Sequence, residues 1–329
     1  MSVRDAVDTA LELPVFTSFT RLGYDARSRL EHWTDLDSYD LTGRVMLVTG
    51  ATSGLGLVAA RQLAANGATV VLLGRDAAKT AGVRDRLAAE TGNESVTTVV
   101  ADMGELGAVR RIAAEVIERF DRLDVLVHNA GALSATRQVA PAAGGGAPLE
   151  LTVASQVVGP FLLTSLLLPL LERTGATSPA RVITMSSGGM YATGLHVDDL
   201  QMGDDYKGSE QYARAKRAQV TLNEMWADRH PGPQVVFHAM HPGWADTPGV
   251  RESLPTFRKV VGPLLRSPEQ GADTLVWLAS DDGEPLAHSG SFWLDRKRRD
   301  LHKLPTTKRT DTPLQRTALW KWVAEAAGA

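Results

Sequence analysis

The stretch RVMLVTGATSGLG, residues 44–56, joins an apolar run to a glycine-rich turn. Residues 44–49 are mostly apolar and β-branched, which predicts a strand buried on both faces. Gly50, Gly54 and Gly56 follow at the spacing G-x-x-x-G-x-G, and residues 54–65 have a helical pattern. Glycines let the chain turn sharply and let a phosphate approach the main chain, while a helix N-terminus offers free N–H groups. The stretch therefore predicts a phosphate-binding strand–turn–helix unit, although a glycine-rich turn without a ligand has the same pattern.

The same alternation of strand and helix continues along the chain. Further strands are predicted at 69–73, 96–101, 123–128, 181–185, 235–240 and 291–294. Helices are predicted at 54–65, 77–90, 106–120, 149–172, 209–229 and 268–280. Strands that alternate with helices form a parallel sheet covered on both faces, and right-handed crossovers make it doubly wound. We therefore expect an α/β, Rossmann-like fold in a single domain, residues 41–295, with an extension at each end.

The two extensions have different characters. In residues 1–40, helical spacing predicts one amphipathic helix packed on the core, with a lid or a membrane-surface helix as alternatives; its apolar positions are Phe16, Phe19, Leu22, Ala26, Leu30 and Trp33. Residues 296–329 begin with seven Lys or Arg in 296–309, which predicts a solvated loop or a phosphate-binding patch. A last helix is expected from Pro313 to near Gly328. Residues 140–148, APAAGGGAP, predict a surface loop.

Composition limits the classes of protein that fit this chain. Its 329 residues are 43% hydrophobic and 22% charged, which is typical of a globular protein. Its net charge of −3 is too close to zero for nucleic-acid binding by bulk charge. The absence of cysteine excludes disulfides, thiolate metal sites and cysteine nucleophiles, and no metal site is predicted. Because the N-terminus is also too charged for a signal peptide, we expect a cytoplasmic protein.

The most apolar stretch is VVGPFLLTSLLLPLL at 157–171. Its 15 residues fall short of the about 20 that a membrane span needs, so it predicts a packed helix and no span. Because it is too apolar for a helix that faces water, we expect one face to form the interface of a homodimer or homotetramer. Complete burial within one chain is the alternative.

Five motifs follow one another in a specific order. They are TGATSGLG at 49–56, HNAG at 128–131, MSSGG at 185–189, YARAK at 212–216 and HPGWADT at 241–247. In this order the chain resembles the short-chain dehydrogenase/reductase family over about residues 41–294. RVITMSSGGM at 181–190, MHPGWADTPGV at 240–250, GADTLVWLA at 271–279 and FWLDRK at 292–297 are similar to the subgroup called dehydrogenase/reductase family member 12.

Tyr212 and Lys216 are four residues apart, so they lie on one face of a helix. A phenol has a pKa near 10, and a neighbouring ammonium together with an oxidised nicotinamide lowers that pKa. Tyr212 can then give a proton to a carbonyl oxygen or take one from an alcohol. The resemblance implies that Ser187, just beyond a strand, binds the substrate oxygen and that Lys216 also holds the nicotinamide ribose.

The strand ends and the resemblance imply a nicotinamide dinucleotide. Arg75 ends the second strand, where an arginine suits a 2′-phosphate, so NADP(H) is favoured over NAD(H). Asp102, which ends the third strand, is expected to accept from the adenine amino group or to cap the next helix. The expected cofactor-binding residues are Gly50, Thr52, Ser53, Gly54, Leu55, Gly56, Arg75, Asp102, Met103, Asn129, Ala130, Gly131, Tyr212, Lys216, Pro242, Gly243, Trp244 and Thr247.

The sequence departs from the family at one catalytic position. The family has an asparagine three residues before a glycine, and counting back from Gly159 gives Gln156. The family's asparagine uses its main-chain carbonyl to hold a water that links the lysine to solvent. Pro160 lacks an N–H, so the carbonyl of Gln156 should be free for such a water. We therefore count Gln156 among the catalytic residues, and we expect structural roles for His128 and His241.

The sequence thus predicts an NADP(H)-dependent oxidoreductase that interconverts a ketone or aldehyde and an alcohol by hydride transfer. Apolar side chains expected around the pocket predict an apolar small-molecule substrate, and they are Met190, Trp244, Phe257 and Trp293. A cofactor-binding regulatory or scaffold protein with little turnover is the first alternative, because of Gln156. An epimerase or lyase of the extended type is the second, although its loop is TGxxGxxG where this chain has TGxxxGxG.

Overall fold

The computed structural model describes residues 3–12, 14–140, 148–253 and 255–329, so the predicted loop at 140–148 lies almost wholly outside them. Within these residues an eight-stranded sheet has the order β10-β9-β8-β7-β4-β1-β2-β3. Every neighbouring pair is parallel except β9 and β10. The strands are β1 (Val45–Thr49), β2 (Thr69–Gly74), β3 (Val96–Val100), β4 (Val125–His128), β7 (Ala180–Met185), β8 (Val235–Met240), β9 (Phe292–Leu294) and β10 (Lys297–Arg299). A separate short ribbon pairs β5 (Val139–Ala140) with β6 (Leu149–Glu150).

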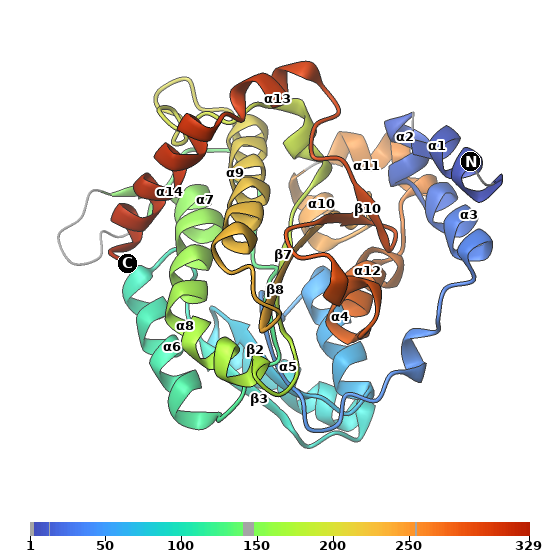
Figure 1. Cartoon of the computed structure of the whole chain (residues 1–329), viewed down its shortest axis with the longest axis vertical. Helices are drawn as coiled ribbons and strands as arrows, with labels where there is room; N and C mark the ends of the chain where they lie inside the picture. The colour runs from blue at the N-terminus through green and yellow to red at the C-terminus, as the bar shows by residue number, and fades with distance from the viewer. Residues whose placement is uncertain (1–2, 13, 141–147, 254) are drawn as a thin grey trace.

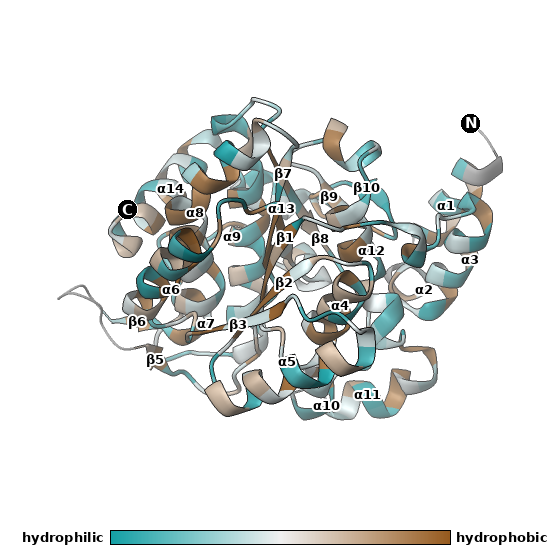
Figure 2. Ribbon diagram, turned by 90° about the horizontal axis from the view of Figure 1, so that it is seen from below, coloured by the Kyte–Doolittle hydropathy of each residue, from teal (hydrophilic) through white to brown (hydrophobic). Residues whose placement is uncertain are grey.

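Helices cover both faces of the sheet (Figure 1). One face carries α4 (Gly54–Ala65), α5 (Ala77–Thr91) and α12 (Pro268–Ser280), and the other carries α6 (Leu106–Arg119), α8 (Gly159–Gly175) and α9 (Gly208–Arg229). The central strands β1, β4, β7 and β8 are buried along their whole length, as their apolar runs predict. Figure 2 shows these strands as the hydrophobic centre between mixed helices. The predicted α/β, doubly wound fold is confirmed.

The predicted apolar helix at 149–172 is a continuous helical stretch with a π-helical part. It consists of α7 (Leu151–Val153), η2 (Ala154–Val158) and α8. By length and composition Leu151–Gly175 could cross a membrane, but 67% of its most apolar window is buried inside the protein, as in a core helix. The last helix, α14 (Pro313–Ala327), packs on α8 and α9, where Trp320 meets Phe161 and Trp226 edge-to-face. The chain itself therefore buries much of this apolar surface, and the oligomer interface stays a prediction.

The N-terminal extension differs from the single amphipathic helix that we predicted. It contains α1 (Val3–Glu12), α2 (Val15–Phe19), α3 (Arg21–Glu31) and the 3-10 turn η1 (Leu36–Ser38). The predicted apolar stripe is wrong for Leu22 and Phe16, which are 47% and 43% exposed, whereas Phe19 is buried. Polar contacts also attach the extension to the domain, because buried Arg27 on α3 forms ion pairs with Asp8 on α1 and with Asp295 in the domain.

The basic segment at 296–309 is also not the solvated loop that we predicted. It forms β10 and then α13 (Pro305–Thr310). Arg296 is buried and pairs with Asp273 on α12, and Arg299 pairs with Asp8 of α1. These arginines therefore join the two extensions to the domain rather than facing solvent. The remaining short elements are η3 (Gly188–Ala192), α10 (Pro248–Ser253), α11 (Pro255–Val261), η4 (Gly262–Leu264) and η5 (Glu284–Ala287).

Candidate active site

The glycine-rich turn lies at the carboxyl edge of the sheet and packs against the end of β4. A Cβ on Gly56 would lie 2.3 Å from Asn129 Nδ2, and a Cβ on Gly50 would lie 2.8 Å from Ala130 Cα. Asn129 Nδ2 donates to the carbonyls of Thr49 and Gly50 at 2.9 and 3.2 Å. Glycine is therefore required at both positions, and Asn129 fixes the turn that opens α4.

The beginning of α4 has the features of an anion site. Ser53 precedes the helix but makes no capping hydrogen bond, so the first-turn N–H groups have no side-chain partner. Gly54 adopts a φ of +55°, and a Cβ there would lie 3.8 Å from its nearest neighbour, Thr247 Cβ, so the main chain is open at this point. Arg75, directly after β2, is exposed and makes no ion pair with any described residue. These residues fit a phosphate-bearing dinucleotide.

The segment after β3 fits the expected cofactor only in part. Asp102 Oδ1 accepts from the N–H of Gly104 at 2.8 Å, so one carboxylate oxygen stabilises a local turn. The side chain of Met103 is buried in the core on the side of α6 and α8, so the prediction that it binds a cofactor is wrong for its side chain. Only main-chain atoms of Met103 remain for a ligand.

The loop after β8 is shaped by a buried arginine. Gly243 adopts a φ of +72°, and a Cβ there would lie 2.2 Å from Arg266 Nε. Pro242 accepts a hydrogen bond from Arg266 Nη1 at 3.3 Å, and Thr247 Oγ1 accepts from the N–H of Val250 at 3.3 Å. The loop therefore brings its predicted residues to the same edge as the glycine turn, with Trp244 half-buried beside them.

Ser187, Tyr212 and Lys216 come together from two elements. Ser187 follows β7, and its Oγ accepts from the N–H of Gly189 at 3.3 Å. Tyr212 and Lys216 lie on α9, with Lys216 Nζ 5.3 Å from the centre of the Tyr212 ring. Lys216 Nζ donates to the carbonyl of Met185, at the end of β7, at 2.9 Å. Tyr212 is hydrogen-bonded to Ser187. The three side chains can therefore act on one oxygen atom.

Burial moves both titratable groups towards their neutral forms in the protein itself. It raises the pKa of Tyr212, and the hydrogen bond with Ser187 opposes this shift only in part. Burial lowers the pKa of Lys216 from 10.5 to about 7. Sequence reasoning expected the Lys216 ammonium and an oxidised nicotinamide together to lower the pKa of Tyr212. In the protein chain by itself, burial of the phenol raises that pKa, and the effect of a bound nicotinamide stays a prediction.

Comparison with known proteins agrees with this geometry. Residues 44–256 match the family model described as short chain dehydrogenase. The chain belongs to the short-chain dehydrogenase/reductase family. It is 37% identical over 302 residues to human dehydrogenase/reductase SDR family member 12. These residues cover 92% of this chain and 91% of that protein. It is 31% identical over 261 residues to human retinol dehydrogenase 12, with 78% and 79% of the two chains covered.

Two solved structures share the fold of this chain. The Pseudomonas aeruginosa RhlG/NADP active-site complex superposes with a TM-score of 0.61 at 28% identity, covering 77% of this chain and 94% of that chain. The oxidoreductase yciK from E. coli superposes with a TM-score of 0.62 at 24% identity, over 80% of this chain. Membership of the family makes this chain a short-chain dehydrogenase/reductase enzyme. The extended-type epimerase alternative has no support from these matches.

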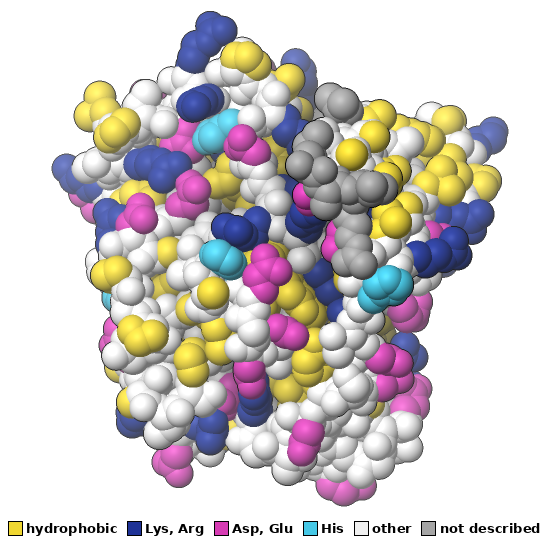
Figure 3. Space-filling view, turned by 45° about the vertical axis from the view of Figure 1, so that its right-hand side comes forward, with side chains coloured by type: hydrophobic (Ala, Val, Ile, Leu, Met, Phe, Trp, Pro, Cys, Tyr) yellow, Lys and Arg dark blue, Asp and Glu magenta, His cyan; other side chains and the backbone are white. Residues whose placement is uncertain are grey.

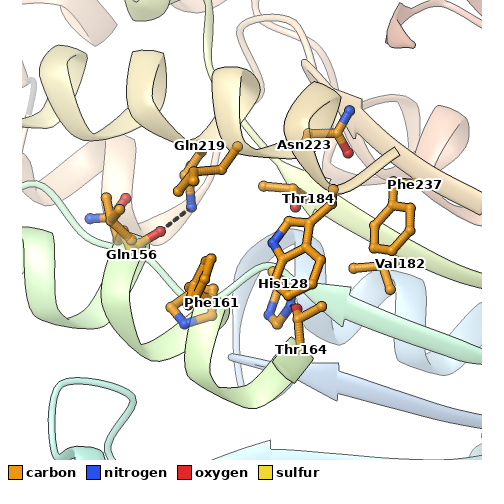
Figure 4. Close-up of a pocket in the computed structure, with 13 residues that line it drawn as sticks. His128, Gln156, Phe161, Thr164, Val182, Thr184, Gln219, Asn223 and Phe237 are labelled. Atoms are coloured by element: carbon orange, nitrogen blue, oxygen red, sulfur yellow. Dashed lines mark hydrogen bonds between the residues drawn. The ribbon is translucent and has the colours of Figure 1, made fainter. Parts of the chain in front are cut away.

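Gln156, at the family's asparagine position, lies in the π-helical part of its helix (Figure 4). Its Nε2 donates to the carbonyl of Ala132 at 2.7 Å. Its main-chain carbonyl is not free as predicted, because Gln219 Nε2 on α9 donates to it at 2.5 Å. Behind this pair lies a cavity of about 30 Å³, which His128 and Thr164 also line and which has room for water.

His128 and His241 form hydrogen bonds inside the protein, as expected for structural roles. His128 Nε2 forms a 2.8 Å hydrogen bond with Thr164 Oγ1, and burial lowers the pKa of His128 to about 3. His241 Nδ1 accepts from the N–H of Gly188 at 3.1 Å, and burial lowers its pKa to about 3. Both rings are therefore neutral at pH 7.

Two of the four predicted pocket residues are misplaced. Trp293 is fully buried between Trp277 and His238, so it belongs to the core and not to a pocket. Met190 is also fully buried, in a small apolar cluster under the Ser187 loop. Both predictions are wrong because apolar residues near a site also fill the core behind it. Trp244 and Phe257 are half-buried and meet edge-to-face with ring centres 5.1 Å apart.

Sequence reasoning missed three residues that shape the site. Gln219 lies three residues after Lys216, and only its buried position on α9 could have drawn attention to it. Arg266 precedes the predicted helix at 268–280 and looks like a surface residue in sequence. Phe19 was assigned to core packing, but the structure places it against the Ser187 loop. In the described part of the chain, no group of three or more His, Asp or Glu is arranged to hold a metal ion.

Proposed function

We propose that this enzyme is an NADP(H)-dependent oxidoreductase that interconverts a ketone or aldehyde and the corresponding alcohol. The observation that carries the proposal is the convergence of Ser187, Tyr212 and Lys216 at the edge where the glycine turn lies. A phenol hydrogen-bonded to a serine hydroxyl can bind one carbonyl oxygen from two sides. Beside them, an ammonium fixed to a strand end supplies positive charge.

The chain's residues have distinct roles in carbonyl reduction. The Tyr212 hydroxyl donates its proton to the substrate oxygen, and the Ser187 hydroxyl donates a hydrogen bond to the same oxygen. Lys216 then stabilises the phenolate that remains, because its ammonium lies near the Tyr212 ring. When bound, a nicotinamide supplies the hydride to the substrate carbon. Oxidation of an alcohol uses the same groups in reverse.

Preference for NADP(H) rests on Arg75. Its guanidinium is exposed directly after β2, beside the turn that begins α4, and no described residue pairs with it. An arginine can bind a 2′-phosphate through two parallel hydrogen bonds. The RhlG structure, which is named as a complex with NADP, supports the same assignment for a relative of similar fold.

An apolar substrate, a cytoplasmic location and a homo-oligomer complete the proposal. Trp244 and Phe257 offer apolar ring surface next to the site, and one relative is named for retinol, an apolar alcohol. The composition, which has no cysteine, supports the cytoplasmic location. The outer face of the apolar helix supports an oligomer less strongly than the sequence did, because α14 covers part of it.

The test is NADPH oxidation with a panel of aliphatic and aryl carbonyls. We expect turnover in the wild type, and Tyr212→Phe should lose about 10²–10⁴-fold in rate while it still binds NADPH. Tyr39→Phe, which removes the hydroxyl that donates to Asp281 far along the chain, is the matched control and should keep its rate. Near-wild-type turnover in Tyr212→Phe would refute the catalytic assignment. NADPH binding without turnover of any carbonyl would favour the regulatory alternative.

A further inference from the structure

The N-terminal extension reaches the active site through α2. Residues 44–256 match the family, so α2 lies outside the segment that carries the family's motifs. In Figure 1 α2 lies at the upper right, away from the sheet centre. Phe19 is 2% exposed and Phe16 is 43% exposed, so α2 presents one ring inwards and one ring outwards.

The inward ring contacts the loop that carries Ser187. A Cβ on Gly188, the residue directly after Ser187, would lie 2.6 Å from Phe19 Cε2 and 3.0 Å from His241 Nε2. The Phe19 and His241 rings meet edge-to-face with centres 4.3 Å apart. Because His241 also accepts from the Gly188 N–H, the two rings together hold the main chain next to the serine.

The outward ring, Phe16, belongs to a row of aromatic side chains that begins at Phe19. Trp244, which follows Gly243, meets Phe19, Phe16 and Phe257 edge-to-face, with ring centres 5.7, 5.9 and 5.1 Å apart. Two of these rings come from α2, Trp244 belongs to the segment that matches the family, and Phe257 directly follows that segment. The row therefore runs outwards from the Ser187 loop to the surface. Figure 3 shows hydrophobic side chains gathered at the upper right of one face of the molecule.

Main-chain and ionic contacts fix α2 in this position. The Trp244 N–H donates to the carbonyl of Phe19 at 2.7 Å. Buried Arg266 donates to the carbonyls of Phe19 and Ser18 at 3.1 and 2.9 Å, and it pairs with buried Asp295. A guanidinium with these partners has few other positions open to it, so α2 is a fixed part of the site.

We propose that α2 forms one wall of the substrate site and sets its specificity. Phe16 contacts the outer part of large apolar carbonyl substrates, and Phe19 is a positioning residue that holds the Ser187 loop. The inference rests on the proposed carbonyl reduction, because it names residues that select among carbonyls. It also gives the extension a role that the family's motifs do not supply.

Phe16→Ala tests the wall directly, because Phe16 is partly exposed and its loss should leave the fold intact. We would measure kcat and KM for a small ketone, cyclohexanone, and for a large one, 2-acetylnaphthalene. The KM for the large ketone should rise by about fivefold or more, whereas that for cyclohexanone should stay within twofold. Phe16→Tyr, which keeps the ring, should restore the wild-type ratio of the KM for 2-acetylnaphthalene to the KM for cyclohexanone. Leu22→Ala, at an equally exposed position in the same extension, is the matched control and should not change it.

The outcomes separate the two proposals. A wild type that reduces neither these ketones nor the rest of the carbonyl panel overturns both. If the wild type turns over both ketones and Phe16→Ala leaves the ratio of their KM values unchanged, only the specificity role is overturned. The same holds if Phe16→Ala raises the two KM values equally.

Phe19→Leu tests the positioning role. We expect its kcat for cyclohexanone to fall about fivefold or more while the NADPH dissociation constant stays within twofold. An unchanged kcat, or NADPH binding that weakens as much as kcat falls, would overturn that role. If Phe19→Leu does not fold, the Phe16 series still decides the specificity proposal.

Discussion

The side-chain amide of Gln219 donates a 2.5 Å hydrogen bond to the main-chain carbonyl of Gln156 (Figure 4). The two residues belong to facing helices, α9 and the π-helical part before α8. Lys216 lies one turn before Gln219 on α9. Sequence reasoning expected the main-chain carbonyl of Gln156 to be free for a water molecule. This carbonyl already accepts from Gln219, so only its second lone pair is available to water.

Gln156→Asn should leave turnover within about tenfold of the wild type, or about 1.4 kcal/mol of barrier. The substitution keeps the main-chain carbonyl and the Gln219 donor, and it loses mainly the bond from Gln156 Nε2 to Ala132. The measurement is steady-state kcat with a carbonyl substrate that the wild type reduces. A gain much larger than tenfold would mean that glutamine had disabled the proton path, and the alternative with little turnover would then be the better description of this chain.

Lys216 makes the stability of the protein depend on pH in a defined direction. Burial lowers its folded-state pKa to about 7, while an unfolded lysine keeps a pKa near 10.4. Between these values the unfolded chain binds a proton that the folded chain does not, so the free energy of unfolding falls as pH falls from about 10 to about 7. Below pH 7 this contribution is constant.

Lys216→Met removes the titrating group, so it provides the comparison. The stability of the variant minus that of the wild type should increase by a few kcal/mol as pH falls from 10 to 7, because one pKa unit corresponds to about 1.4 kcal/mol. Urea unfolding of the protein without added nucleotide at several pH values measures this difference. The lost hydrogen bond to Met185 shifts the whole curve and does not change its slope. A difference that is flat over this range would show that Lys216 keeps an ordinary pKa.

Arg75→Asp should reverse the cofactor preference. Loss of a charge-assisted phosphate contact costs roughly 1.5–3 kcal/mol, so NADPH binding should weaken at least about tenfold. NADH binding should be unchanged or stronger, since an acid at this position can accept from the ribose 2′-hydroxyl. Fluorescence titration of both nucleotides gives the ratio. Arg86→Asp, an exposed change of the same charge on α5, is the control. If the two affinities keep their relative values in Arg75→Asp, the NADP(H) assignment is wrong.

The alternation of strands and helices was sufficient to predict the seven parallel strands of the sheet, because buried parallel strands are apolar. It missed β10, whose Lys297–Arg299 is entirely basic. This strand forms because Asp295 and Arg296 adopt φ values of +55° and +52°, as in a two-residue hairpin turn, and no glycine marks the turn. Their buried ion pairs with Arg266 and Asp273 stabilise it, and such pairing cannot be seen in local sequence.

The catalytic residues were predictable for a different reason. Tyr212 and Lys216 lie four residues apart on one helix, so sequence spacing alone places them together. Phe19 lies 169 positions from Gly188, and Gln219 meets Gln156 across two helices. No periodic pattern predicts such contacts, because they depend on how the extension and the helices pack in three dimensions. The contacts of Phe19 and Gln219 are therefore the parts of the site that sequence reasoning could not predict.

Asp295→Asn should destabilise the protein strongly, because it leaves two buried arginines without their shared carboxylate. Asp295 is fully buried, with Arg27 Nη1 at 2.6 Å and Arg266 Nη1 at 2.5 Å. Removal of one partner from a buried ion pair costs about 3–5 kcal/mol. The free energy of unfolding in urea at pH 7 is the measurement. Glu269→Gln, which breaks the partly exposed pair with Arg61, is the control and should cost about 1 kcal/mol or less.

The same variant has a pH signature that identifies the ionised carboxylate as the cause. Burial would raise the pKa of Asp295, but Arg266 and Arg27 outweigh it and hold the pKa below the ordinary value of 3.8. The carboxylate therefore stabilises the fold at every pH above 3.8, and this contribution is lost as pH falls further towards the folded-state pKa. The difference in the free energy of unfolding between wild type and Asp295→Asn should thus be constant from pH 7 to about pH 5 and should become smaller below pH 4. A gap as small as that of Glu269→Gln at pH 7 would show that Arg27 and Arg266 do not depend on Asp295, and that α2 is fixed by its main-chain bonds and by Phe19 alone.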